Sequence, residues 1–278
     1  MIDNFALEKS KIANLPIAFF DSGLGGMAVL KALQAIYPFE SCRYYGDTAR
    51  LPYGALQKNQ IQKHCMQGLR FLLQEPVKLF VLACNTASIC SREVLEKSFS
   101  VPHVDVFAST LEEACLESRN SKVVLFATRA TVESKIYEIA IKKRRKDLDL
   151  LGIACPNFVP LIERAKMDLL EKEIVQTCKK LKEHKVDTLI LACTHYALIR
   201  DLILKHLPYE LNVVCSATAC ARAVFKYLKE QDLLAENKTR KDRFFVSSNP
   251  SNFSKNIERY FAVKNLHVQK ANFHYNLA

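Results

Sequence analysis

The stretch FVLACNTA at positions 80–87 is the basis of our fold prediction. Its pattern is repeated by LILACTHY at positions 189–196. Each stretch is an apolar run that ends in Ala-Cys, with a threonine one or two residues after the cysteine. Continuously apolar runs of this length are typical of parallel strands that are buried on both faces. Open α/β sheets bind ligands at the carboxyl ends of their strands, where both cysteines stand. The repeat therefore predicts two facing half-sites, each with one thiol.

Apolar runs of strand length alternate with helical stretches on both sides of these segments. Strands are expected at 16–20, 42–45, 77–83, 103–107, 122–127, 148–154, 187–192, 212–215, 243–246 and 266–269. Helices are expected at 26–37, 59–73, 87–97, 110–117, 131–143, 159–183 (a long stretch with room for an interruption), 196–206, 217–228 and 251–261. This alternation predicts the α/β class, with mainly parallel sheets covered by helices.

The repeated Ala-Cys element argues for two similar α/β domains rather than one wide sheet. The 278 residues are enough for two domains of ordinary size. We place the boundary near residue 107, so that residues 1–106 and 217–278 form the first domain and residues 107–216 the second. The segment after residue 216 is too short to stand alone, and its return to the first domain would keep the chain ends together. The active site is then expected in the cleft between the domains.

The bulk composition indicates a reduced, cytoplasmic protein. At 49% hydrophobic and 25% charged residues the chain is ordinary for a globular protein, and it has no apolar run of membrane-spanning length. The first fifteen residues lack the basic-then-apolar order of a signal peptide and are expected to form a short extra arm. The ten cysteines contain no Cys-x-x-Cys pair, which argues against a zinc site. We expect most of them to be small buried hydrophobic residues.

The formal net charge is +11, and a basic balance can indicate nucleic acid or another anionic surface. The densest basic run is KKRRK at positions 142–146, followed closely by Asp147 and Asp149. No aromatic residues interrupt it and no nucleic-acid motif accompanies it. We therefore interpret the run as a solvated helix end whose charges complement the helix dipole, and we do not expect nucleic acid as a partner.

Two further segments lie at predicted strand-to-helix turns. In FDSGLGG (20–26), glycines let the backbone approach a ligand and the helix start offers N–H donors to an anion. The same segment also fits a plain turn capped by Ser22 or Asp21, and its spacing is not that of a dinucleotide fingerprint. YGDTARLPYG (45–54) is a turn-rich loop after a strand, the kind of segment that often carries function.

The two cysteines are the strongest candidates for chemistry. A thiol at a helix N-terminus has a lowered pKa, and although a single buried cysteine is usually packing, two at matched positions favour catalysis. His195 can tune Cys193 or relay a proton, or it can serve as a hydrogen-bond partner at a helix start. Glu163 can hold His195 or Cys193 in one protonation state, but from the residues alone a solvated helix position is the better interpretation.

Taken together, the segments resemble the glutamate racemases of the cofactor-independent aspartate/glutamate racemase superfamily. The resemblance runs from about residue 17 to residue 261 and rests on FDSGLGG (20–26), YGDTARLPYG (45–54), ACNTAS (83–88) and CTHY (193–196). The Cys-Thr-His order resembles the glutamate branch, since aspartate racemases usually carry an acid where His195 stands. The resemblance implies interconversion of L- and D-glutamate for bacterial peptidoglycan synthesis by a cytoplasmic homodimer that needs no cofactor or metal and does not bind membranes.

The resemblance also implies roles for individual residues. Cys84 and Cys193 would be the two acid/base thiols, with Asp21 assisting Cys84 and with His195 and Glu163 assisting Cys193. The implied substrate shell is Asp21, Ser22, Tyr53, Gly54, Asn85, Thr86, Thr131, Thr194 and His195. The chain departs from the family pattern at Ala192, Ala197 and Cys215, where Gly, Pro and an acid are usual, and none of these changes removes a catalytic group.

Three other functions stay open at this point. The first is racemisation of aspartate or another acidic amino acid. The second is a non-catalytic protein whose basic surface binds a partner such as DNA or a topoisomerase. The third is a cysteine hydrolase, although no recognised motif joins a Cys-His pair to an orienting acid.

Overall fold

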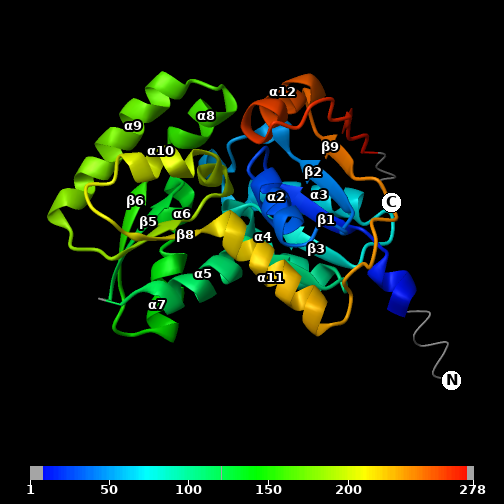
Figure 1. Ribbon diagram of the computed structural model, residues 1–278, viewed down its shortest axis with the longest axis horizontal. Helices are drawn as coiled ribbons and strands as arrows, with labels where there is room; N and C mark the ends of the chain where they lie inside the picture. The colour runs from blue at the N-terminus through cyan, green and yellow to red at the C-terminus, as the bar shows by residue number, and fades with distance from the viewer. Residues whose placement is uncertain (1–8, 120, 274–278) are drawn as a thin grey trace.

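The computed structural model describes residues 9–119 and 121–273, and the strands in this part of the chain form two separate sheets (Figure 1). The larger sheet has six strands in the order β10-β9-β2-β1-β3-β4, and the smaller has four in the order β6-β5-β7-β8. Every described ladder is parallel. The strands are β1 Ile17–Asp21, β2 Cys42–Gly46, β3 Leu79–Leu82, β4 His103–Asp105, β5 Lys122–Ala127, β6 Asp149–Ala154, β7 Thr188–Leu191, β8 Asn212–Cys215, β9 Arg243–Val246 and β10 Val268–Lys270.

Helices cover the faces of both sheets, which confirms the predicted α/β class (Figure 1). The α-helices are α2 Gly26–Ile36, α3 Lys58–Leu72, α4 Asn85–Ser98, α5 Val106–Glu117, α6 Arg129–Glu133, α7 Ile136–Arg144, α8 Phe158–Glu163, α9 Met167–Lys179, α10 Arg200–Lys205, α11 Ser216–Glu230 and α12 Pro250–Phe261. Short 3-10 helices are η1 Thr48–Arg50, η2 Tyr53–Ala55, η3 Lys180–Glu183 and η4 Thr194–Ile199. Residues 9–13 of the expected N-terminal arm are also helical.

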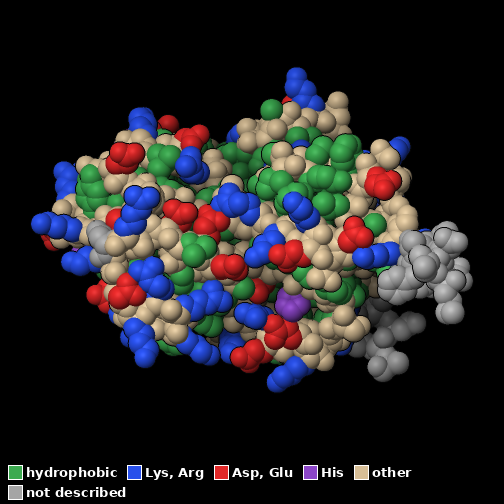
Figure 2. Space-filling view, turned by 60° about the horizontal axis from the view of Figure 1, so that its bottom comes forward, with side chains coloured by type: hydrophobic (Ala, Val, Ile, Leu, Met, Phe, Trp, Pro, Cys, Tyr) green, Lys and Arg blue, Asp and Glu red, His purple; other side chains and the backbone are tan. Residues whose placement is uncertain are grey.

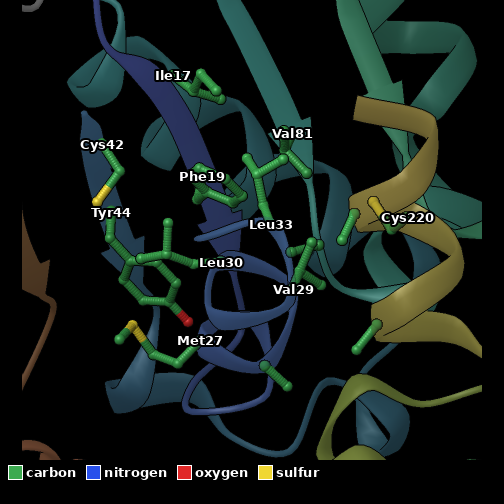
Figure 3. Close-up of a cluster of buried hydrophobic side chains, with 14 of the residues drawn as sticks. Ile17, Phe19, Met27, Val29, Leu30, Leu33, Cys42, Tyr44, Val81 and Cys220 are labelled. Atoms are coloured by element: carbon green, nitrogen blue, oxygen red, sulfur yellow. The ribbon is translucent and has the colours of Figure 1, made fainter. Parts of the chain in front are cut away.

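Strand β1 shows why the larger sheet is buried on both faces. All five of its residues are buried, and successive side chains of a strand point to opposite faces. Ile17 and Phe19 pack with α2 and α11 in one cluster, whereas Ala18 and Phe20 pack with α3 in another. Figure 3 shows the first cluster, in which Phe19 lies against Leu33 of α2.

The smaller sheet is built on the same principle. Val124 and Phe126 of β5 pack in a cluster with α8 and α9 on one face. Val123 and Leu125 pack with α5 and α7 on the other. An apolar strand with a helix layer on each face explains why the continuous apolar runs of the sequence became parallel strands.

The last strands of the chain return to the larger sheet, where β9 pairs with β2 and β10 pairs with β9. Helix α11 packs against both α2 and α5, and its Arg222 forms an ion pair with Glu113 of α5 at 2.5 Å. The division into residues 1–106 with 217–278 and residues 107–216 agrees with this strand pairing and stays a prediction. Residues 1–8, 120 and 274–278 of those ranges lie outside the described part.

The expected strand at 103–107 is wrong at its carboxyl end. β4 stops at Asp105, whose Oδ1 accepts a hydrogen bond from the backbone N of Ala108 at 2.8 Å and so caps α5. Because this cap forms, α5 begins at Val106 rather than at the expected residue 110.

Three expected helices are divided. The stretch at 131–143 splits into α6 and α7 at Lys135, and the stretch at 159–183 splits into α8, α9 and η3 with Ala165 in the first gap. Lys135 and Ala165 have left-handed backbone conformations, with φ of 53° and 52°, which end a right-handed helix. The stretch at 196–206 is η4 followed by α10.

The basic run at 142–146 forms the end of α7 and the turn after it. Lys142 pairs with Asp149 and Arg145 pairs with Asp147, both at 2.6 Å. On the face shown in Figure 2, Lys and Arg side chains alternate with Asp and Glu rather than forming one basic patch. Within the described residues, no helix has the length and apolar character needed to cross a membrane.

Candidate active site

Tertiary structure brings the two repeated cysteines to one cavity. Cys84 follows β3 at the N-cap position of α4, and Cys193 follows β7 at the N-cap position of η4, so each thiol stands at the carboxyl end of an interior strand of its own sheet. Both side chains are buried, each at 7% exposure, and both line the same cavity. Matched strand ends in two sheets thus give two thiols on one cavity, as the repeat predicts.

The cavity is small. The space that the centres of water molecules can reach is about 20 Å³, which is room for about one water. Entry of an amino acid therefore requires its walls to separate. The lining residues are Ser22, Leu51, Pro52, Tyr53, Gly54, Cys84, Asn85, Thr86, Thr128, Val159, Cys193, Thr194 and His195, and none of these is a lysine or arginine.

A second cavity, of about 220 Å³, adjoins the first. The two share the residues Pro52, Gly54, Thr128 and Val159. Arg129, which is exposed, also lines the second cavity. A cationic side chain therefore lies on an approach to a cavity whose own wall carries neither lysine nor arginine.

On the first side of the cavity, the Cys84 Sγ donates a hydrogen bond to the Ser22 Oγ at 3.5 Å. Burial raises the pKa of the Cys84 thiol above its ordinary value, and the nearby Asp21 carboxyl adds to this effect. The hydrogen bond to Ser22 and a backbone hydrogen bond from Ala87 oppose the rise without cancelling it. In the closed site, this balance favours the protonated thiol at Cys84.

Asp21 lies behind this half-site rather than in the cavity wall. It is fully buried, and its Oδ2 accepts a hydrogen bond from the Gly23 backbone N at 2.8 Å. Its Oδ1 has no hydrogen-bond partner among the described residues. Burial raises the Asp21 pKa, while His195 and backbone hydrogen bonds from Gly23 and Gly26 lower it. The carboxyl is thus held near Cys84 with one oxygen unused.

On the second side, Glu163 connects His195, which lies two residues after Cys193, to the loop that follows β1 in the larger sheet. The Glu163 Oε1 lies 2.8 Å from the His195 Nε2 and accepts a hydrogen bond from the Leu24 backbone N at 3.0 Å. Burial alone lowers the His195 pKa, but hydrogen bonds with Cys193 and Glu163 outweigh it and raise the pKa well above its ordinary value. His195 is therefore held as an imidazolium beside Cys193.

Gly25 allows the two halves to approach at this point. A Cβ at position 25 would lie 2.5 Å from the His195 Nδ1 and 2.6 Å from the Thr194 Oγ1, and any side chain there would displace them. Glycine is therefore required for the loop after β1 to pack against the Cys193 half-site.

Asn85 presents a hydrogen-bond donor that none of the described residues accepts. Its Oδ1 accepts a hydrogen bond from the Tyr137 hydroxyl at 2.6 Å, which orients the amide. Its buried Nδ2 has no partner among the described residues. A buried, unpartnered donor is costly unless a ligand uses it, so Asn85 is well placed to bind a carboxylate.

A row of threonines continues the wall. The Thr86 and Thr128 hydroxyls lie 3.2 Å apart, and the Thr128 hydroxyl lies 3.1 Å from that of Thr131. Thr128 lines the cavity, whereas Thr131 lies behind it and does not. Gly54 packs directly on this row, because a Cβ there would lie 2.7 Å from the Thr128 Cβ.

Tyr53 lines the cavity, but its hydroxyl group is bound to another side chain. The hydroxyl donates to the Asp47 Oδ2 at 2.7 Å, behind the wall. The Asp47 Oδ1 also accepts hydrogen bonds from the Arg50 guanidinium at 2.8 Å and the Tyr45 hydroxyl at 3.2 Å. This buried network holds the loop after β2 against the site.

The structure thus gathers Ser22, Tyr53, Gly54, Cys84, Asn85, Thr86, Cys193, Thr194 and His195 at the cavity wall, and places Asp21, Thr131 and Glu163 behind it. Sequence reasoning missed Thr128, the hydroxyl donor Tyr137, and the apolar wall residues Leu51, Pro52 and Val159. Thr128 directly follows β5, so its place at a strand-to-helix turn was the signal that would have found it. Among the described residues, no three His, Cys, Asp or Glu side chains form a group that would hold a metal ion.

Two thiols that line one small cavity between two parallel α/β sheets fit an enzyme of the racemase class. The family model for Asp/Glu/Hydantoin racemases matches residues 32–224, and the chain belongs to this family. The expected family and fold are therefore confirmed.

Relatives and solved structures agree with this assignment. A glutamate racemase of Thermoanaerobacter sp. (strain X514) is 40% identical over 252 residues, which cover 90% of this chain and 94% of the relative. A glutamate racemase of Geobacter metallireducens is 35% identical over 254 residues, covering 89% and 93%. The structure of a Bacillus anthracis glutamate racemase isoform matches with a TM-score of 0.87 at 30% identity, covering 93% of this chain and 97% of that one. The Francisella tularensis glutamate racemase, solved in complex with D-glutamate, matches with a TM-score of 0.86 at 29% identity, covering 94% and 99%.

Proposed function

We propose that this protein interconverts L-glutamate and D-glutamate by proton transfer at Cα between Cys84 and Cys193, without a cofactor. The observation that carries the proposal is that two thiols at strand ends of two different sheets line one small cavity. The family assignment and relatives of up to 40% identity named glutamate racemase support glutamate as the substrate.

The two half-sites would work in sequence. One cysteine, as a thiolate, removes the Cα proton, and the other, as a thiol, donates its proton to the opposite face of Cα. The first cysteine ends as a thiol and the second as a thiolate, so the protein is ready for the reverse reaction. His195 would support charge changes at Cys193, and Asp21 would assist Cys84.

Charge that develops on Cα must spread into the substrate α-carboxylate. Donors fixed in advance around that group stabilise it, and each is worth about 3 to 4 kcal/mol when removed singly. The unpartnered Asn85 Nδ2 supports such a role, and the hydroxyls of Ser22, Thr86 and Thr194 line the same cavity. Closure around the substrate excludes water and strengthens these contacts.

Incubation with L-glutamate in D2O tests the proposal. Optical rotation follows the change of enantiomer, and proton NMR follows deuterium at Cα. A two-thiol enzyme labels the product early while the remaining substrate stays mostly protonated. Equal early labelling of both enantiomers would point to one shared base, and preferred turnover of L-aspartate would identify a different acidic substrate.

We also propose that the protein acts as a homodimer in the cytoplasm and supplies D-glutamate for peptidoglycan synthesis. These statements rest on its resemblance to the glutamate racemases. Sedimentation equilibrium tests the dimer, with a mass of one chain as the contrary result. Growth of a D-glutamate auxotroph on expression of the chain tests the physiological role.

A further inference from the structure

Side chains of α12, which packs on the larger sheet, bind the carboxyl end of α8. α8 has six residues, and the last carbonyls of a helix lack partners within the helix. The Asn256 Nδ2 donates to the Glu163 backbone O at 2.9 Å, and the Tyr260 hydroxyl donates to the Ile162 backbone O at 2.8 Å. Both donors belong to α12, whose apolar face packs in the core of the larger sheet. In Figure 1, α8 and α12 lie at the top of the two halves.

Asn256 is built to hold this position. Its side chain is buried, with 2% of the residue exposed. The Arg259 guanidinium donates to the Asn256 Oδ1 at 3.3 Å, which turns the Nδ2 toward Glu163. The amide is thus oriented before it binds the Glu163 carbonyl.

From the Glu163 backbone the contacts continue to the chemistry. The carboxylate of the same residue bridges the Leu24 backbone N and the His195 Nε2. His195 lines the cavity together with Cys193. Hydrogen bonds therefore run from α12 through Glu163 to His195, which lies in the same cavity wall as one of the two thiols.

We propose that Asn256 is a positioning residue for the Cys193 half-site, because its amide fixes the Glu163 backbone and thereby the carboxylate that orients His195. The proposal rests on the proposed racemase function. The Cys84 half-site is supported by Ser22 and Asp21 instead, so loss of the Asn256 amide perturbs one proton transfer more than the other.

The asymmetry has a specific kinetic signature. Two enantiomers are equally stable, so kcat/KM must be equal in the two directions for every variant. A defect at Cys193 alone therefore cannot appear as a difference in kcat/KM. It appears as unequal primary isotope effects for Cα-deuterated L- and D-glutamate. The slowed transfer limits the rate in both directions, but it moves the deuteron only when Cys193 takes it from Cα.

The test compares Asn256→Ala with Ser254→Ala in the full-length protein. Ser254 is on the same helix and donates to the Leu266 backbone O at 2.8 Å, away from the site, so it serves as the matched control. Loss of one hydrogen bond predicts that Asn256→Ala lowers kcat/KM by about five- to tenfold in both directions. The isotope effect is expected to rise for one enantiomer only. Ser254→Ala is expected to stay within about twofold of the wild type.

A double-mutant cycle with Glu163→Gln decides whether Asn256 acts through Glu163. Adding Asn256→Ala to Glu163→Gln is then expected to cost much less than it costs in the wild type. Full additivity, or equal changes in both isotope effects, would overturn the proposal. If Asn256→Ala does not fold, Tyr260→Phe is the second variant. It frees the Ile162 carbonyl and also removes a contact with the Met167 sulfur, and the same one-sided isotope effect is expected.

A measurement without turnover separates this inference from the proposed function. NMR titration of His195, which faces Glu163, Cys193 and Asp21, is expected to show a lower pKa in Asn256→Ala than in the wild type. An unchanged His195 pKa would refute the positioning role. If wild-type protein does not racemise glutamate, the proposed function fails while this titration still tests the hydrogen-bonded chain.

Discussion

Replacement of Glu163 by glutamine gives the sharpest test of the Cys193 half-site. Glutamine keeps the size of glutamate and an oxygen that accepts from the Leu24 backbone N and the His195 ring. It removes only the negative charge that faces the imidazolium. The exposed fractions of the two side chains are 3% for His195 and 16% for Glu163, so solvent screens the pair little.

The size of the effect follows from the hydrogen bond that is weakened. A hydrogen bond to a charged group contributes about 1.5 to 3 kcal/mol, and the neutral one that glutamine keeps contributes about 0.5 to 1.5 kcal/mol. Loss of the charge therefore removes about 1 to 1.5 kcal/mol of the interaction that favours the imidazolium. The His195 pKa is lowered, because burial, which lowers it, then meets less opposition.

Two assays read this change. NMR titration of His195 measures the pKa directly, and the limb of the kcat/KM profile that reports loss of the imidazolium is expected to move to lower pH by the same amount. Ser254→Ala, which leaves both side chains of the pair and the hydrogen bonds from α12 to α8 in place, is the control. An unchanged His195 titration would refute the assignment of Glu163 as the partner that keeps His195 charged.

The effect of Glu163→Gln on the free energy of unfolding is expected to depend on pH. A histidine whose pKa is raised by folding stabilises the protein fully below its unfolded pKa of about 6.5, and this contribution is lost as pH rises through the folded value. Glu163→Gln is therefore expected to lower the free energy of unfolding more at pH 6 than at pH 9, as measured by urea denaturation. An equal loss at both pH values would contradict the linkage.

Four further predictions concern the cavity itself. Cys84→Ser and Cys193→Ser are each expected to abolish nearly all racemisation measured by optical rotation, because a serine hydroxyl is a far weaker acid than a thiol. Asn85→Ala is expected to lower kcat about a hundred- to a thousandfold by removing a preorganised donor. Gly54→Ala is expected to raise KM and lower kcat, because its Cβ meets the Thr128 Cβ at 2.7 Å. Arg129→Gln is expected to raise KM several-fold at low salt with kcat unchanged, an effect that fades as salt screens the charge.

Matched variants control these predictions. In Gly152→Ala, the new Cβ would lie 3.0 Å from a Val132 methyl group, away from the cavity. This variant is expected to keep full activity. Arg144→Gln removes one exposed charge from α7 and is expected to leave KM unchanged. Substantial racemisation by either cysteine variant would exclude the two-thiol mechanism, and a salt-independent KM in Arg129→Gln would exclude electrostatic attraction.

Local sequence patterns predicted most of the strands, since a continuous apolar run between turns is readable without knowledge of its neighbours. β5, β8 and β9 have the expected bounds. The helix break at Lys135 was not predicted, and the interruption expected within 159–183 could not be placed at Ala165. Neither residue has a side chain that favours the left-handed conformation it adopts. The early start of α5 was also missed. Asp105 caps the helix because the chain turns directly after it, and the sequence does not show that turn.

Two thiols at the carboxyl ends of two buried parallel strands could be predicted from local residues, because an apolar run and the cysteine after it are local properties. Which groups surround the thiols depends on packing between elements that are distant in the chain. Asn85 and Tyr137, Glu163 and His195, and Asn256 and Glu163 are far apart in the chain, and their hydrogen bonds exist because two sheets and α12 pack together. From its residues alone Glu163 was best interpreted as solvated, and it is packing across the sheets that gave its carboxylate two partners.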